Sequence, residues 1–278
     1  MKLIVSFLWA VALTAASGLF GLTPASADGD VVSRIVSNKV LRVGVAEYPP
    51  FVMKDTQTGE LKGFEIDAAN KLADEMGVKA EFHNMAWGTI IAGLQADQYD
   101  VIMSGMGRSI QRSMSVDFTD PSVSLVDVAM VRSDRDISDW ADIAKGTGSV
   151  AAVLGGLPYL KADNDRSQLG TASLTPFKEL ALAGNAVISG QAQAWIEDVV
   201  SIGNFINAHP DIPLKTIPVP FLGREAGNGY AVRKGDMELL NVLNIFINGM
   251  QESGEYRKLA AKWKLPEQVL IPGRLEGK

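Results

Sequence analysis

Hydrophobic positions in the first half of the chain follow two spacings. Short apolar and β-branched runs at Val40–Ala46, Val78–Phe82 and Val101–Met103 are typical of buried strands. Between them, Phe64–Met76 carries apolar residues at helical spacing, and Thr89–Leu94 is a shorter segment of the same kind. This strand–helix–strand–helix–strand order predicts a parallel sheet with helices on its faces.

A second α/β unit follows in the sequence. Its predicted strands are Leu125–Arg132, Val150–Leu154, Gln193–Glu197, Leu214–Val219 and Tyr230–Val232. Its predicted helices are Ser138–Ala144, Val199–Asn207, a helix that begins at Asp236, and Glu255–Lys264. Ser138 is the predicted cap of the first of these helices. A further helix is predicted to begin at Thr175 and Pro176, because Thr is a favoured N-cap and Pro suits the first helical position. Two such units predict two lobes, with a ligand cleft beyond the carboxyl ends of the strands.

The first residues have the features of an export signal. Lys2 is followed by the apolar run Leu3–Leu22, and Ala25–Ala27 forms a small-residue cleavage site before Asp28. The alternative is a membrane anchor, but glycines and a proline interrupt the end of the run, and no basic stop-transfer cluster follows. We therefore expect a cleaved signal peptide over residues 1–27 and a periplasmic location.

The amino-acid composition excludes several classes of function. The chain has no cysteine, which excludes a lipid anchor on cysteine, disulfides and thiolate metal sites. Its 26 basic and 32 acidic residues give a net charge of −6, with no basic run suited to nucleic acid. The two histidines, His83 and His209, have no metal-ligand or hydrolase motif around them. We expect no cofactor, no metal and no nucleic-acid partner.

Five segments appear in the order of a known family. They are Leu41–Val45 with Tyr48–Phe51, Gly63–Asp67, Ser104–Met106 with Arg112 and Val116–Pro121, Ser189–Asp198, and Gly254–Trp263. Together they resemble bacterial extracellular solute-binding protein family 3, the periplasmic polar amino-acid-binding proteins of ABC importers.

That resemblance implies a type II periplasmic-binding-protein fold, in which two α/β lobes enclose a central ligand cleft. Two hinge crossings are expected near residues 124–126 and 226–230. Lobe 1 would comprise residues 28–125 plus 228–278, and lobe 2 residues 126–227. The protein would be a monomer that captures a small molecule, an amino acid or a related amine or carboxylate, and delivers it to a membrane permease.

An amino-acid ligand needs a partner for its carboxylate. Arg112 is the candidate, because a guanidinium fork matches two carboxylate oxygens and remains charged. Ser109 is expected to cap the short helix that holds it. Ser104, Gly105 and Gly107 are candidates in the preceding turn, where backbone N–H groups can approach a ligand. The alternative is that Arg112 is a solvated surface charge.

The ligand's ammonium needs a carboxylate from the other lobe. Asp198 follows the predicted strand Gln193–Glu197, and we expect it to project into the cleft. The alternative is that it only caps the helix beginning at Val199. Glu197 is expected to face the other way.

Tyr48 and Trp87 match aromatic positions of the family and are candidate walls for the ligand, although core packing is the alternative. Glu47 could pair with a cationic side chain, and Gly155 could offer a backbone N–H group after a strand. Trp195 is expected in the core.

The chain departs from the family pattern in two turns. The family usually has a hydroxyl residue where this chain has Gly107, and usually Gly-Thr where this chain has Gly156 and Leu157. Losing a hydroxyl removes about 1 kcal/mol of hydrogen bonding. The departures leave the ligand's identity open among acidic, neutral and basic amino acids.

Two other functions occur on folds of this kind. Cyclohexadienyl dehydratases use a Glu soon after a Gly-Gly-Thr turn as general acid, whereas Gly155–Tyr159 contains no carboxylate and the next is Asp163. We therefore expect no enzyme activity. A soluble ligand sensor is the other alternative, although sensors of this fold are normally tethered to a membrane-spanning segment.

Overall fold

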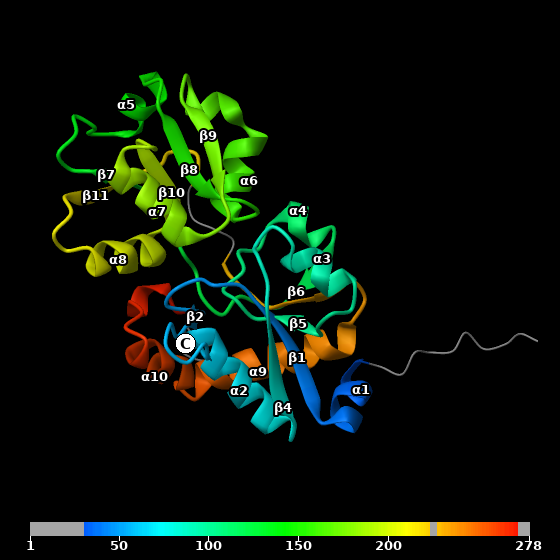
Figure 1. The fold of residues 1–278 in the computed structure, drawn as a ribbon. Coiled ribbons are helices and arrows are strands. Elements are labelled where there is room, and N and C mark those ends of the chain that lie inside the picture. Colours follow the sequence, from blue (N-terminus) through cyan, green and yellow to red (C-terminus); the bar gives the residue numbers. More distant parts are fainter. Residues whose placement is uncertain (1–30, 223–226, 272–278) are drawn as a thin grey trace, which may run out of the picture.

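The computed structural model describes residues 31–222 and 227–271. Within these ranges the chain forms two lobes, each built on a five-stranded sheet (Figure 1). The expected signal peptide lies outside the described residues. In the described part of the chain, no helix combines the length and apolar character needed to cross a membrane.

The first sheet has the strand order β4-β1-β5-β12-β6. As predicted, β1 pairs in parallel with β4 and β5, whereas β12 runs antiparallel to β5 and β6. The strands are β1 (Val40–Val45), β4 (Lys79–Asn84), β5 (Val101–Ile102), β6 (Val116–Phe118) and β12 (Ala231–Arg233). The sheet is therefore completed by a strand from near the end of the chain.

Helices cover both faces of this sheet, and a two-stranded hairpin lies beside it (Figure 1). They are α1 (Val31–Asn38), α2 (Phe64–Glu75), α3 (Ile90–Gln95), α4 (Ile110–Ser113), α9 (Met237–Glu252) and α10 (Glu255–Lys262), with a 3-10 turn at Glu267–Val269 and the hairpin strands β2 (Met53–Lys54) and β3 (Leu61–Lys62). The predicted stripe of α2 is buried at Ile66, Ala69 and Leu72. Helix α1 was not predicted from the sequence.

The second sheet has the order β11-β7-β10-β8-β9 and is mixed, because β7 runs antiparallel to its neighbours β10 and β11. Its strands are β7 (Asp127–Arg132), β8 (Ser149–Val153), β9 (Ser173–Phe177), β10 (Ala194–Asp198) and β11 (Leu214–Pro218). The helices are α5 (Trp140–Lys145), α6 (Leu157–Asn164), α7 (Leu180–Ser189) and α8 (Val199–Ala208), with a 3-10 turn at Arg166–Leu169.

Two local predictions in this lobe were wrong. Thr175 and Pro176 lie inside strand β9, and helix α7 starts only at Leu180. A proline is compatible with β9 because this strand forms the edge of its sheet, where one side needs no N–H donor. Helix α5 is capped by Asp139 rather than Ser138, in a reciprocal capping box with Asp142.

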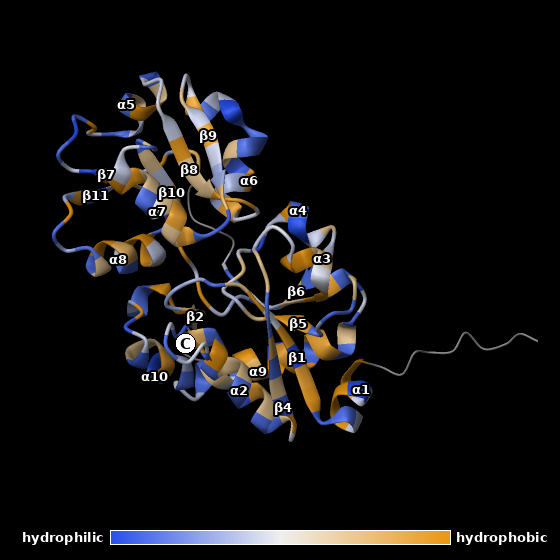
Figure 2. Ribbon diagram, in the orientation of Figure 1, coloured by the Kyte–Doolittle hydropathy of each residue, from blue (hydrophilic) through white to orange (hydrophobic). Residues whose placement is uncertain are grey.

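Apolar residues concentrate on the strands and on the helix faces that cover them (Figure 2). Trp195 in β10 is fully buried, as predicted. The chain passes from the first sheet to the second between β6 and β7, and returns between β11 and β12. These crossings lie side by side, since the N–H of Asn228 donates to the carbonyl oxygen of Val123 at 2.7 Å. The predicted hinge residue Ala226 lies outside the described residues.

Candidate functional site

A cavity lies between the lobes, and we call it the interlobe cavity. From the first lobe and the return crossing it is lined by Tyr48, Trp87, Gly105, Gly107, Arg112 and Asn228. From the second lobe it is lined by Val153, Gly156, Leu157, Pro158 and Glu197. The cavity thus lies where the ends of β1, β5, β8 and β10 face one another, as the sequence predicted for a cleft.

Arg112 is buried in the wall of this cavity, with 5% of its surface exposed. Nη1 donates to the carbonyl oxygen of Gly107 at 2.6 Å, and Nη2 donates across the cleft to that of Gly155 at 2.7 Å. Ser109 caps α4 as predicted, because its Oγ accepts from the N–H of Arg112. The guanidinium therefore occupies a fixed position, bonded to carbonyl oxygens that a carboxylate can replace with stronger, charge-assisted bonds.

The turn before Arg112 is held from behind by buried side chains. The N–H of Gly105 donates to Oε1 of Glu65 at 3.1 Å, and its carbonyl oxygen accepts from Nδ2 of Asn228 at 2.7 Å. Gly105 has φ +61°, and a Cβ there would lie 3.1 Å from the ring of Tyr48, so the position favours glycine. Ser104 is buried and is not a lining residue; its Oγ bonds both the N–H and the carbonyl oxygen of Ala46.

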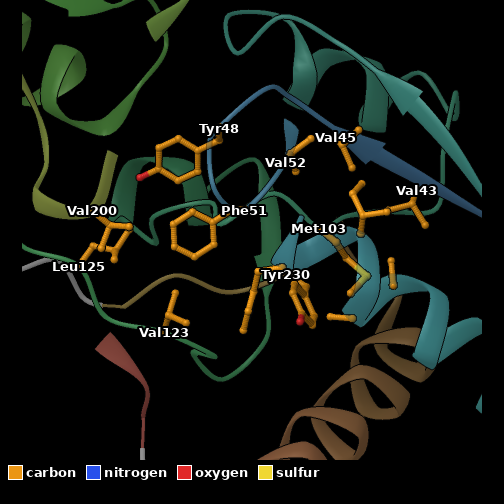
Figure 3. Packing of buried hydrophobic residues seen from close by; sticks show 14 of the residues in the cluster. Val43, Val45, Tyr48, Phe51, Val52, Met103, Val123, Leu125, Val200 and Tyr230 are labelled. Atoms are coloured by element: carbon orange, nitrogen blue, oxygen red, sulfur yellow. The ribbon is translucent and has the colours of Figure 1, made fainter. Parts of the chain in front are cut away.

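Tyr48 and Trp87 lie together on the first-lobe wall, as predicted. The Tyr48 ring stacks on Phe51 with centroids 5.1 Å apart (Figure 3) and meets Trp87 edge to face at 5.5 Å. The Tyr48 hydroxyl donates across the cleft to Oδ2 of Asp198 at 2.5 Å. The aromatic wall is therefore also a contact between the lobes.

The two acids at the end of β10 have different surroundings. Asp198 is 1% exposed and caps α8, with Oδ1 accepting from the N–H groups of Val200 and Ser201 at 2.8 and 3.0 Å. Burial raises the pKa of Asp198 above its ordinary value. Asp198 is absent from the lining, although its partner Tyr48 belongs to it, and its role toward an ammonium stays a prediction.

Glu197 lines the cavity, so the expectation that it faces away was wrong. Successive strand residues point to opposite faces, and the side chain of Asp198 turns back onto the first turn of α8. That leaves the cavity face to Glu197. The N–H of Asp198 donates to Oε1 of Glu197 at 3.1 Å, which fixes the orientation of the carboxylate.

Glu47 and Gly155 lie next to the interlobe cavity but do not line it. Glu47 is exposed and accepts a bond from Nδ2 of Asn84 at 3.2 Å. It belongs to a neighbouring groove, which we call the rim groove and which also has Trp87, Lys178 and Glu179 in its lining. Gly155 accepts a hydrogen bond from Arg112 with its carbonyl oxygen, and the contact of its N–H with a ligand stays a prediction.

Sequence reasoning missed Asn228 and misplaced Glu197. Asn228 is 2% exposed, and its Oδ1 has no hydrogen-bond partner within the described residues. A signal was present, because this asparagine lies between two glycines at the predicted second hinge. Among the residues that the structure describes, no group of three or more acidic or histidine side chains is arranged to hold a metal ion.

Comparisons with known proteins agree with this geometry. This chain is 29% identical to a probable histidine-binding protein of Neisseria gonorrhoeae, over 92% of this chain and 94% of that protein. It is 28% identical to the arginine-binding extracellular protein ArtP of Bacillus subtilis, over 92% and 97%. Both relatives are named for the amino acid they bind.

A solved structure is also similar to this chain over most of its length. The ancestral amino-acid-binding protein AncCDT-1, described as a precursor of cyclohexadienyl dehydratase, superposes with a TM-score of 0.75 at 34% identity, covering 84% of this chain and 98% of that one. Residues 41–266 match the family described as bacterial extracellular solute-binding proteins, family 3. The chain belongs to the bacterial extracellular solute-binding proteins, family 3.

Proposed function

We propose that this protein is the substrate-binding component of an ABC importer and that it captures an amino acid in the interlobe cavity. The buried guanidinium of Arg112 carries the proposal. A cation at this depth needs compensating groups, and Arg112 is directed at the cavity from a capped helix. The carboxylate common to all amino acids supplies the matching charge.

The acidic end of β10 supports the second contact. A carboxylate enters the cavity from the second lobe, opposite Arg112 on the first. A zwitterion held between them contacts both lobes at once. The relatives named for histidine, arginine, glutamine and cystine share a carboxylate and an ammonium, whatever their side chains.

Capture then follows from closure of two lobes, residues 28–125 plus 228–278 and residues 126–227. Hydrogen bonds already bridge the cleft, among them those from Arg112 to Gly155 and from Tyr48 to Asp198. A ligand that binds Arg112 replaces the first of these bonds. The closed form gains stability in proportion to the ligand's additional contacts with the second lobe.

The proposed function also implies a cellular location and a membrane partner. After cleavage of residues 1–27, the protein works in the periplasm as a monomer and presents its closed form to a membrane permease. The signal-like composition of those residues and the extracellular family support this location.

Binding without catalysis is part of the proposal. The turn that opens α6 carries Gly156, Leu157 and Pro158, and offers no acid group at the place where dehydratases of this fold have one. The relatives named as binding proteins agree.

A ligand screen tests the function. We expect at least one of the twenty L-amino acids to raise the unfolding temperature of the mature protein and to bind in a calorimetric titration. Prephenate and arogenate should remain unchanged on incubation. No binding by any amino acid, or formation of product from prephenate or arogenate, would refute the proposal.

A further inference from the structure

A buried carboxylate lies directly behind the first-lobe wall of the interlobe cavity. Glu65, in the first turn of α2, is fully buried and does not line the cavity. Its Oε1 accepts from the N–H of Gly105 at 3.1 Å, and Gly105 is a lining residue. Its own N–H donates at 3.0 Å to the carbonyl oxygen of Phe51, the ring on which Tyr48 stacks (Figure 3). Glu65 therefore supports two parts of the wall from behind.

Two tyrosines face Glu65 from other elements. The hydroxyls of Tyr230, which precedes β12, and of Tyr256 on α10 bond each other at 2.8 Å. Burial, and next the charge of Glu65, raises the pKa of both tyrosines, so both stay neutral near pH 7. On α2 itself, Asp67 is turned away and accepts from Nζ of Lys262 at 2.7 Å. Glu65 thus faces hydroxyl groups rather than a cation.

The carboxyl of Glu65 is poorly compensated for its depth. Its Oε2 has no partner at hydrogen-bonding geometry within the described residues, although the hydroxyl of Tyr230 is close enough to lower its pKa. Burial is the larger influence and raises the pKa from 4.5 to about 7. Glu65 therefore exchanges its proton with solvent in the neutral pH range.

A ligand carboxylate at Arg112 changes the charge near Glu65. Nη1 of Arg112 donates to the carbonyl oxygen of Gly107, two residues beyond the N–H that Glu65 holds. The guanidinium and Glu65 are thus attached to the same turn. A bound carboxylate offsets the positive charge and adds a negative one, and a nearby like charge disfavours an ionised acid. Binding at Arg112 therefore favours the neutral form of Glu65.

Buried acids of the second lobe respond in the opposite sense. Asp127 and Asp198 lie opposite each other on β7 and β10, and burial raises the pKa of both. The ammonium of an amino acid favours ionised carboxylates, so these acids would release protons on binding. The sign of the proton exchange therefore shows which wall responds to the ligand.

We propose that Glu65 is a positioning residue for the turn at Gly105, and that capture of an amino acid transfers a proton from solvent to its carboxylate. This inference rests on the proposed function. A protonated carboxyl keeps an acceptor oxygen, so the bond from Gly105 persists in the complex. Linkage is reciprocal: if the ligand favours the proton, the proton favours the ligand by the same factor. Affinity therefore rises as the pH falls through the neutral range.

Calorimetric titrations of the mature wild-type protein, in buffers with different ionisation enthalpies, count the protons. The probe is whichever of the twenty L-amino acids raises the unfolding temperature most. If binding raises the pKa of Glu65 by about one unit, the protein should take up about half a proton at pH 7.5. The dissociation constant should then be about sixfold larger at pH 8.5 than at pH 6.5.

Substitutions at Glu65 assign the proton. Glu65→Gln keeps an acceptor for the N–H of Gly105 but cannot ionise, so it should take up no proton. It should match wild-type affinity at pH 6.5 within about twofold and bind at least fivefold more tightly than wild type at pH 8.5. A group that only supported the fold would not give this gain. Glu60→Gln, at an exposed position, is the control and should behave as wild type at both pH values.

Glu65→Asp provides a second variant if Glu65→Gln does not fold. It keeps a carboxyl but shortens it, and an aspartate has a lower ordinary pKa than a glutamate. The pH of maximal proton uptake should therefore move from its wild-type value. An unmoved maximum would place the proton on another group and overturn the inference.

Three further results would also overturn it. Proton release by the wild type on binding would assign the exchange to the second lobe. Unchanged uptake in Glu65→Gln would exclude Glu65 as the site of the proton. An equal loss of affinity in Glu65→Gln at both pH values would leave Glu65 with a structural role alone.

Failure of the proposed function would look different. In that case no amino acid would bind the wild-type protein at either pH. If an amino acid binds with the same affinity at both pH values and without proton exchange, the importer function stands and only the role of Glu65 is wrong.

Discussion

The two walls of the interlobe cavity differ in what they offer a ligand. The first-lobe wall presents the guanidinium of Arg112 and the amide of Asn228, whereas the second-lobe wall presents apolar side chains and the carboxylate of Glu197. Neither wall alone complements both charges of a zwitterion. A ligand with both charges therefore binds the closed form better than either open lobe, which is the differential contact that closure requires.

The walls also differ in how they are supported. Behind the first, buried polar groups hold the turn at Gly105, namely Glu65 and Asn228. The second wall approaches the first through backbone, since Gly155 lies against Gly88. Support by an ionisable group makes the first wall sensitive to pH, and support by close backbone contact makes the second sensitive to added side-chain volume.

The largest effect on this comparison should come from Gly155→Ala. Gly155 has φ +82°, and a Cβ there would lie 2.9 Å from Cα of Gly88 across the cleft. The lobes could not approach as closely, so ligand affinity should fall at least 100-fold, about 3 kcal/mol, in a calorimetric titration.

Gly190→Ala is the matched control for this variant. Gly190 has a similar φ of +78°, but a Cβ there meets nothing within 4 Å. The control should lose stability through backbone strain and keep its affinity. Equal loss of affinity in both variants would show that strain, not blocked closure, is the cause.

The next effect concerns Glu65 behind the first wall. Burial raises the pKa of Glu65 from 4.5 to about 7, since desolvation outweighs its bonds to Gly105 and Tyr230. Because the pKa of Glu65 is higher in the folded state than in the unfolded state, protonation of Glu65 stabilises the fold. This contribution to the free energy of unfolding is fully present below pH 4.5 and is lost as the pH rises through 7. With about 1.4 kcal/mol for each pKa unit, the loss should be roughly 3 kcal/mol.

Urea unfolding of wild type and Glu65→Gln at pH 4.5 and pH 8 measures this loss. The variant should lack the decrease in free energy of unfolding that the wild type shows between these pH values. Glu60→Gln, at an exposed position, should retain the wild-type dependence. A Glu65→Gln protein with unchanged pH dependence would contradict the assignment.

A smaller effect is expected at Leu157 on the second wall. Leu157 is 7% exposed and lines the cavity. Leu157→Thr restores the hydroxyl usual in related proteins but removes apolar contact, and should weaken binding of the amino acid found in the ligand screen about tenfold, near 1.5 kcal/mol. Leu182→Thr, at an exposed position on α7, should have no effect on binding, and an equal loss in both would exclude Leu157 from the ligand's surroundings.

The sequence predicted the elements whose signals are local. Strand β1 and helix α2 stand within a residue or two of their predicted bounds, because an apolar run and a helical stripe are properties of the segment itself. The cap at Ser109 is local in the same way. Pro176 was misassigned because a Thr-Pro pair suits a helix start and an edge strand alike, and only the strand order distinguishes them.

Part of the site was also predicted, because some of its residues lie in segments with a local sequence signal. Tyr48 and Trp87 stand in loops and Arg112 stands on the short helix α4, and the structure brings them together. Which of the two acids of β10 faces the cavity depends on the helix cap and on the hydroxyl of Tyr48, 150 residues away in the chain. Asn228 contributes through the pairing of the two crossings, which no local pattern encodes.

The central claim is that Arg112 binds the carboxylate of an amino acid. Its most direct test is a calorimetric titration of wild type and Arg112→Ala with the most stabilising amino acid and with the amide of that amino acid, which lacks the carboxylate charge. The wild type should prefer the acid at least 100-fold, and Arg112→Ala should bind both equally weakly. An Arg112→Ala protein that still prefers the acid by the wild-type factor would contradict the account.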